Sequence, residues 1–88
     1  MSDDVKKYYS DLYKVILSLQ TEKDCEEFFC DLLTIKELNS IAQRVKAGKL
    51  LKEGQTYEQI ISKTDISSAT LSRISRSLKY GTGYKKFL

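Results

Sequence analysis

The side chains best suited to chemistry in this sequence are hydroxyl and guanidinium groups that gather between positions 67 and 76. At helical spacing, one outward face of this stretch carries small and basic residues: Ser68, Ala69, Ser72, Arg73 and Arg76. Hydroxyl groups and arginines donate hydrogen bonds to phosphate oxygens and to base edges, and small residues let a backbone approach a groove closely. The pattern therefore indicates binding to a nucleic acid.

Residues for catalysis or metal binding are scarce. The sequence has no His and no glycine-rich phosphate loop, and Cys25 and Cys30 would lie on different faces of a helix that contains both. No nucleophile has a base partner, so we expect no enzyme activity, no metal and no cofactor. The two thiols are typical of reduced cytoplasmic side chains, and no apolar stretch approaches the roughly 18 residues that a membrane span requires. We expect a cytoplasmic protein without a membrane partner.

Charge is unevenly distributed along the chain. Residues 1–43 carry five Lys against nine Asp or Glu, a balance of −4, whereas residues 44–88 carry ten Lys or Arg against three acidic residues, a balance of +7. The C-terminal half is therefore suited to a polyanion such as DNA. On charge alone, a solvated basic surface explains the asymmetry equally well.

Apolar spacing predicts an all-α protein of five helices in a single domain, residues 1–88. Apolar residues recur three or four positions apart from Val5 to Leu19, and Thr21 is expected to cap a second helix. A domain of this size has a marginal core, and oligomerisation is the remaining way to enlarge it. We therefore assign residues 1–33 to dimerisation helices.

A central helix is expected over residues 34–54. Thr34 with Glu37 forms a capping box at its start, and Gly54 is suited to the position just beyond its end. Glycine within a helix costs about 1 kcal/mol relative to alanine. Gly48 therefore indicates close packing against another element.

Residues 56–79 have the pattern of a helix-turn-helix. Thr56 with Gln59 forms a capping box for one short helix, and Ser67 caps a second that runs to about Lys79. The turn over residues 64–66 has Asp65 where this motif usually has a left-handed glycine, a conformation that Asp tolerates. The side chains expected to wedge the helices apart are Ile60, Ile66, Leu71 and Ile74.

The first helix of this motif would add backbone contacts to those of the second helix. Gly81 and Gly83 are expected to stop the second helix. The residues assigned to DNA contact are Thr56, Tyr57, Lys63, Ser67, Ser68, Ala69, Thr70, Ser72, Arg73 and Arg76.

The run from Ala42 to Tyr84 resembles the trp-repressor superfamily, and more closely its YerC/YecD-like branch of bacterial proteins. The resemblance covers about residues 28–84, and four motifs carry it in order: LT-x-x-E, QRV, L-x-x-G-x-T-Y and SATLSR. The fold of this family is an all-α, intertwined homodimer that presents two recognition helices to successive major grooves. The resemblance implies the same fold here, with the aromatic N-terminal helix wrapped around the partner chain.

The resemblance also implies a candidate effector pocket. In the trp repressor the indole of the co-repressor lies between two arginines, whose positions resemble Arg44 and Arg73. Backbone carbonyls of the Leu33–Thr34 region and the hydroxyl of Ser77 would complete the polar contacts. The glycine that makes room for the indole corresponds to Ile74, and overpacking there costs about 1–3 kcal/mol. We therefore expect that binding does not depend on tryptophan, and that a smaller effector of unknown identity, or none, is used.

These features predict a dimeric, sequence-specific DNA-binding regulator that represses transcription by occupying a palindromic operator. An arginine that reads guanine in the trp repressor corresponds to Glu58, so the operator should differ from that of the trp repressor. The alternative is a helix-turn-helix module that docks on a protein of the transcription machinery. Salt dependence distinguishes the two, because phosphate contacts weaken steeply with salt and an apolar dock does not.

Overall fold

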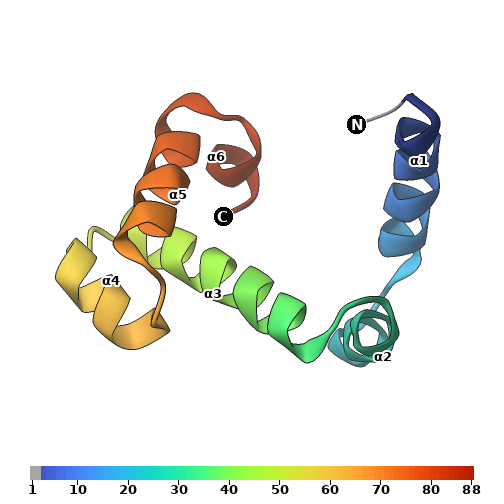
Figure 1. The fold of residues 1–88 in the computed structure, drawn as a ribbon, viewed down its shortest axis with the longest axis horizontal. Coiled ribbons are helices and arrows are strands. Elements are labelled where there is room, and N and C mark those ends of the chain that lie inside the picture. Colours follow the sequence, from blue (N-terminus) through green and yellow to red (C-terminus); the bar gives the residue numbers. More distant parts are fainter. Residues whose placement is uncertain (1–2) are drawn as a thin grey trace. The chain divides into compact units, whose positions relative to one another are not determined.

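The computed structural model describes residues 3–88, with side chains from residue 4 onwards. Every regular element in this range is a helix, which confirms the all-α prediction (Figure 1). The elements are α1 Asp3–Ser18, α2 Glu22–Leu32, α3 Ile35–Lys52, α4 Tyr57–Thr64, α5 Ser68–Tyr80 and α6 Gly83–Phe87. Residues 1 and 2, the start of the predicted dimerisation segment, lie outside the described range.

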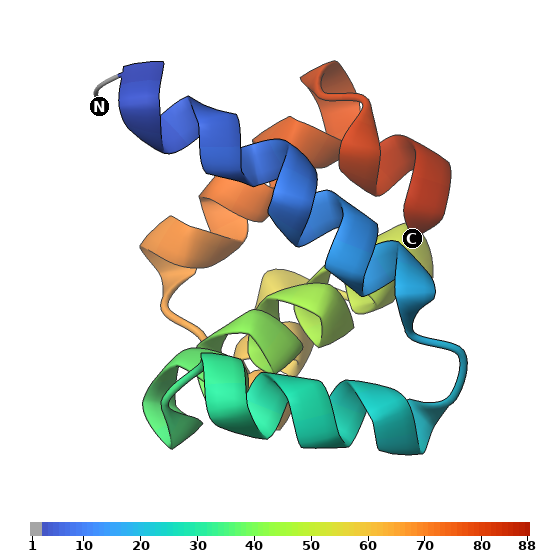
Figure 2. The ribbon, with the colours of Figure 1, turned by 90° about the vertical axis from the view of Figure 1, so that its right-hand side faces the viewer.

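The chain divides into two compact units, Met1–Thr34 and Ile35–Leu88. The first unit consists of α1 and α2, the blue and blue-green helices of Figure 2, joined by a short loop. Thr21 caps α2 as expected: its Oγ1 accepts a hydrogen bond from Asp24 N at 3.0 Å, and Asp24 Oδ2 accepts one from Gln20 N at 3.0 Å. These reciprocal bonds satisfy two of the free amides at the start of the segment.

Apolar residues of α1 stay accessible in the single chain. Leu12 and Ile16 keep 38% and 39% of their surface exposed, and no described residue of α2 is buried. In the second unit, Ile41 and Val45 on α3 are 49% and 38% exposed. Exposed apolar residues in such numbers are typical of a surface that associates with another chain.

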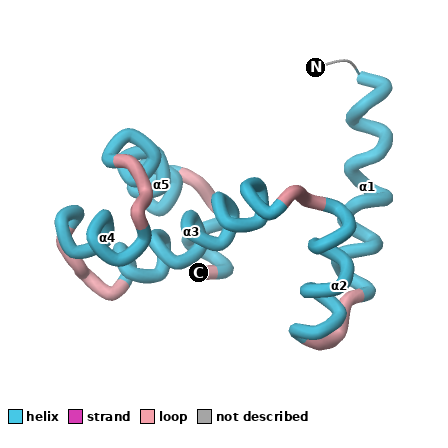
Figure 3. Tube along the Cα trace, turned by 60° about the horizontal axis from the view of Figure 1, so that its bottom comes forward, coloured by secondary structure: helices cyan, strands magenta, loops and turns pink. Residues whose placement is uncertain are grey.

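The second unit has the hydrophobic core. In this unit α3 packs against α4 and α5 (Figure 3), and α6 packs against α5 (Figure 1). Its buried apolar side chains are Ala47, Leu50, Ile60, Ile66, Leu71 and Ile74. The four residues predicted to wedge the two motif helices apart are all among them.

Local signals place α4 and α5. Gly54 adopts φ +88°, and the amides of Gly54 and Gln55 donate to the carbonyls of Leu51 and Leu50, which is the hydrogen-bond pattern of a Schellman motif. The capping box of Thr56 and Gln59 is complete, with bonds of 2.9 and 3.2 Å.

The turn between α4 and α5 adopts the predicted left-handed conformation, with Asp65 at φ 57° and ψ 17°. Buried Thr64 supports this turn, because its hydroxyl donates to Ile60 O at 2.8 Å and accepts from Ile66 N at 3.4 Å. Ser67 then caps α5, accepting from Thr70 N at 3.2 Å. The α4–turn–α5 segment thus has the element order of a helix-turn-helix.

The end of the chain differs from the prediction of five helices. Gly81 ends α5 in an extended conformation, but Gly83 begins α6 instead of stopping the chain's last helix. A Cβ built on Gly48 of α3 would collide with Leu88 Cδ1. The close packing predicted at Gly48 is therefore confirmed, and the residue that packs there is Leu88, which follows α6.

Candidate nucleic-acid interface

The outward face of α5 consists of small, hydroxyl and basic side chains. All five residues predicted there are exposed: Ser68, Ala69, Ser72, Arg73 and Arg76. On the opposite face, Leu71 and Ile74 are 0% and 3% exposed and anchor the helix in the core. Because α5 has no acidic residue, the only charges on its exposed face are positive. Such a surface suits an anionic groove.

Two predicted contact residues at the start of α5 bond to each other. Ser67 Oγ donates to Thr70 Oγ1 at 2.9 Å, in addition to capping the helix. Thr70 is half-buried, whereas Ser67 is exposed. This bond fixes the side-chain orientation of both residues where α5 would meet a ligand.

Helix α4 and its N-cap provide the remaining predicted contact residues. Thr56 caps α4, and Tyr57 is its first residue, with 40% of its surface exposed. Lys63 Nζ donates to Gln55 Oε1 at 2.9 Å, which ties the end of α4 to the loop before it. Glu58 is exposed on the same helix and would repel a phosphate.

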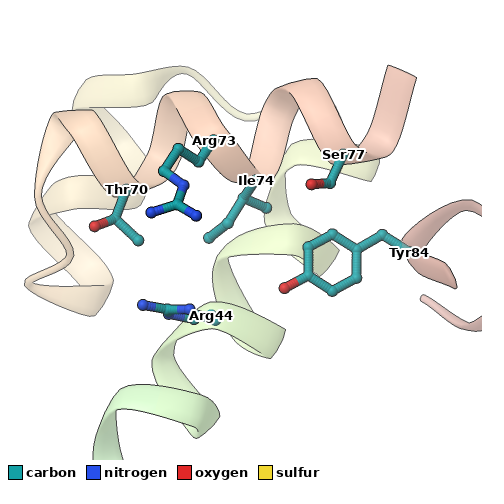
Figure 4. A pocket seen from close by; sticks show the side chains of 6 residues that line it. All are labelled: Arg44, Thr70, Arg73, Ile74, Ser77 and Tyr84. Atoms are coloured by element: carbon teal, nitrogen blue, oxygen red, sulfur yellow. The ribbon is translucent and has the colours of Figure 1, made fainter. Parts of the chain in front are cut away.

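A cavity of about 110 Å³ lies between α3, α5 and α6. Arg44 reaches it from α3 and Arg73 from α5, while Tyr84 enters from α6 (Figure 4). The remaining lining residues are Thr70, Ile74 and Ser77. Among the described side chains, no carboxylate lies within ion-pair distance of Arg44 or Arg73. The cavity is therefore basic, rich in hydroxyls and small.

Four of the six residues assigned to the candidate effector pocket line this cavity: Arg44, Arg73, Ile74 and Ser77. Leu33 and Thr34 belong to the first unit and are not among its lining residues, so their part in a pocket stays a prediction. Ile74 is buried in the core, as expected if its side chain fills the space that an indole would need.

Comparison with known proteins agrees with the helical architecture. The family model described as Trp repressor protein matches residues 7–88, a wider range than the motifs alone indicated. The chain belongs to the Trp repressor family.

Individual relatives support the YerC-like branch. The uncharacterised protein YerC of Bacillus subtilis (strain 168) is 45% identical over 75 residues, which is 85% of this chain and 72% of YerC. A crystal structure of a TrpR-like protein from Eubacterium eligens has a TM-score of 0.86 at 42% identity, covering 91% of this chain and 84% of the other. A candidate Trp repressor from Staphylococcus aureus has a TM-score of 0.83 at 36% identity, covering 96% and 89%.

The trp-repressor-like fold of this family member is thereby established, and the family is one of DNA-binding regulators, not enzymes. None of the helices within residues 3–88 combines the length and apolar character needed to cross a membrane.

The residue that sequence reasoning missed in this Trp repressor family member is Tyr84. It is half-buried against the core and lines the cavity beside the two arginines. A signal was present: Tyr84 and Leu88 are four positions apart, the spacing of an apolar face on one more helical turn. The glycines at 81 and 83 mask this signal, since glycine by itself favours the end of a helix.

Proposed function

We propose that this protein is a dimeric, sequence-specific DNA-binding repressor that acts by occupying a palindromic operator. The observation that carries the proposal is the outward face of α5, where Ser68, Ser72, Arg73 and Arg76 are exposed while Leu71 and Ile74 anchor the helix from behind. A helix fixed in this way presents hydroxyl and guanidinium donors on a rigid surface, and the major groove admits one helix. The membership in the Trp repressor family supports the same assignment.

Dimerisation is proposed from the exposed apolar residues of α1 and of the first half of α3. Two copies related by a two-fold axis would place two α5 helices on one face of DNA, so the operator would be palindromic. Repression would be steric, since occupancy of the operator by the proposed α5 interface needs no further module and the family members are regulators.

Tryptophan is not expected to control this binding. Ile74 fills the core between α3 and α5, where an indole would need space. A cavity of about 110 Å³ remains beside it. A small effector, or none, is consistent with the arginines and hydroxyls that line it.

Selection of bound sequences from a random double-stranded DNA pool tests the proposal. The expected result is an enriched palindrome whose affinity falls steeply with salt, because each phosphate contact releases counterions. The absence of any enriched sequence would contradict sequence-specific binding. A salt-independent association with a protein of the transcription machinery would favour the docking module instead.

A further inference from the structure

Helix α6 joins the two elements that position the candidate interface. It packs against α5, and it also reaches α3 together with the residue that follows it. Lys52 Nζ donates to Lys85 O at 3.5 Å, Leu88 lies against buried Gly48, and Tyr84 lines the same cavity as Arg44.

The extended conformation of Gly81 lets the chain turn back towards α3. A larger residue would not fit there, since a Cβ at Gly81 would lie 2.7 Å from Ser77 O. The end of α5 and the start of α6 are therefore held in one arrangement.

The Tyr84 ring lines the cavity between α3 and α5. Its side chain enters from α6 beneath Ile74 and Ser77, with the hydroxyl end directed towards the Arg44 side of the cavity (Figure 4). Tyr84 also packs against the core cluster that contains Leu71 and Ile74. The Tyr84 side chain therefore lies between residues of α3 and residues of α5.

We propose that α6 is an internal brace and that Tyr84 is its positioning residue, holding α5 on α3 in the arrangement that reads DNA. The proposal rests on the proposed DNA-binding function. With the brace in place, a side chain of the protein itself packs beside the cavity between α3 and α5, so holding α5 needs no small molecule.

The physical reason is that base readout tolerates little displacement. Arg73 lies on α5 directly above the cavity, so a change in how α5 rests on α3 moves its guanidinium relative to the groove. Contacts to base edges depend on this position, whereas non-specific attraction depends mainly on total charge. Removal of the brace should therefore reduce specific affinity more than non-specific affinity.

The experiment compares Tyr84→Ala with wild type on the selected operator and on an unrelated duplex of equal length. We expect specific affinity to fall about tenfold or more, within the usual range of intramolecular coupling, while non-specific affinity stays unchanged. Tyr84→Phe keeps the ring and should bind as wild type. The matched controls are Tyr80→Ala and Phe87→Ala, which remove aromatic side chains that are 83% and 79% exposed.

Chemical rescue gives a readout that a general decrease in stability would not produce. Tyr84→Ala keeps Cβ and removes the phenol group, so the space that it leaves has the shape of a phenol molecule. Engineered apolar cavities bind small aromatic molecules in this way. Added phenol should restore specific affinity in Tyr84→Ala and have no effect on wild type. If Tyr84→Ala does not fold, Tyr84→Leu, which keeps contact with the core but not the reach to Arg44, replaces it for the affinity comparison.

Hydrogen exchange on the free protein separates this proposal from the proposed function. Tyr84→Ala should speed amide exchange in α5 more than in α4, since a uniform decrease in stability would speed both alike. Three results would each contradict the proposal that α6 is a brace. These are wild-type specific affinity in Tyr84→Ala, an equal decrease of specific and non-specific affinity, and unchanged amide exchange in α5. If the wild-type protein binds all DNA sequences equally, the proposed function is contradicted instead. The difference in amide exchange of α5 between wild type and Tyr84→Ala then still tests whether Tyr84 holds that helix.

Discussion

Arg44 on α3 and Arg73 on α5 face one cavity from opposite walls, and the side chain of Ile74 points into the space between their helices. Among the described residues no ion pair is formed by either guanidinium group, and we propose that this site meets an anion, such as a DNA phosphate or a small effector. Ile74 limits the size of a ligand that fits in this cavity, because its side chain is 3% exposed and part of the core.

Tryptophan should therefore not raise the affinity of this protein for DNA. Calorimetric titration of wild type with L-tryptophan should show no saturable heat, and operator affinity should not change on its addition. Ile74→Gly should open the space but lower the free energy of unfolding by several kcal/mol, about 1 from glycine in a helix and about 2–5 from the reduced burial. Micromolar binding of tryptophan to wild type, coupled to tighter operator binding, would show that Ile74 does not exclude the indole.

Arg73→Ala and Arg76→Ala should each weaken operator binding without a change in helix content. The cost should be about 1–3 kcal/mol where the side chain reads a base, and the salt slope should fall by about one unit for each phosphate that the variant no longer neutralises. Fluorescence anisotropy at several salt concentrations measures both. Lys14→Ala, in the acidic half of the chain, is the control for removal of a positive charge. A double arginine variant with wild-type affinity and slope would show that α5 is not the recognition helix.

Half-sites should lie about 34 Å apart, one turn of DNA, because a two-fold dimer presents both α5 helices on one face. Inserting about five base pairs at the operator centre moves one half-site to the far side of the duplex and should reduce binding to that of a single half-site. An insertion of about ten base pairs returns the half-site to the original face and separates the effect of rotation from that of distance. Full affinity for the five-base-pair spacing would contradict the dimer geometry.

Light scattering at micromolar concentration should give the mass of a dimer. Leu12→Asp with Ile16→Asp places two charges on the apolar stripe of α1 and should yield a monomer or a poorly folded chain, as should deletion of residues 1–19. Leu17→Asp is the matched control, because Leu17 lies off the stripe and is 82% exposed. A monomeric wild type would exclude the proposed dimer.

Asp65 should tolerate glycine far better than a β-branched residue. Its φ of 57° is a conformation that costs roughly 1–2 kcal/mol for most L-residues and little for glycine. Asp65→Val should therefore be less stable than Asp65→Gly by about this amount in urea unfolding. Equal stability of the two variants would mean that the turn relaxes to another conformation.

Signals that act within a few residues could be predicted directly from the sequence. The caps at Thr21, Thr56 and Ser67 and the left-handed conformation of Asp65 all occur where the pattern predicts them. Each depends on one hydrogen bond or one pair of dihedral angles between close neighbours, so no distant partner is needed to specify it. The wedge of Ile60, Ile66, Leu71 and Ile74 follows from the same local periodicity, and all four are buried.

Packing between distant positions was decided by the tertiary structure. Tyr84 lines the cavity with Arg44, forty positions earlier in the chain, and Leu88 lies against Gly48. The glycines at 81 and 83 favour the end of a helix in isolation, but the packing of Tyr84 on the core and of Leu88 on Gly48 offsets that preference and stabilises α6. Glycine in a helix costs about 1 kcal/mol relative to alanine, and the packing of two large side chains acts in the opposite direction, so tertiary contacts determine where this chain's last helix forms.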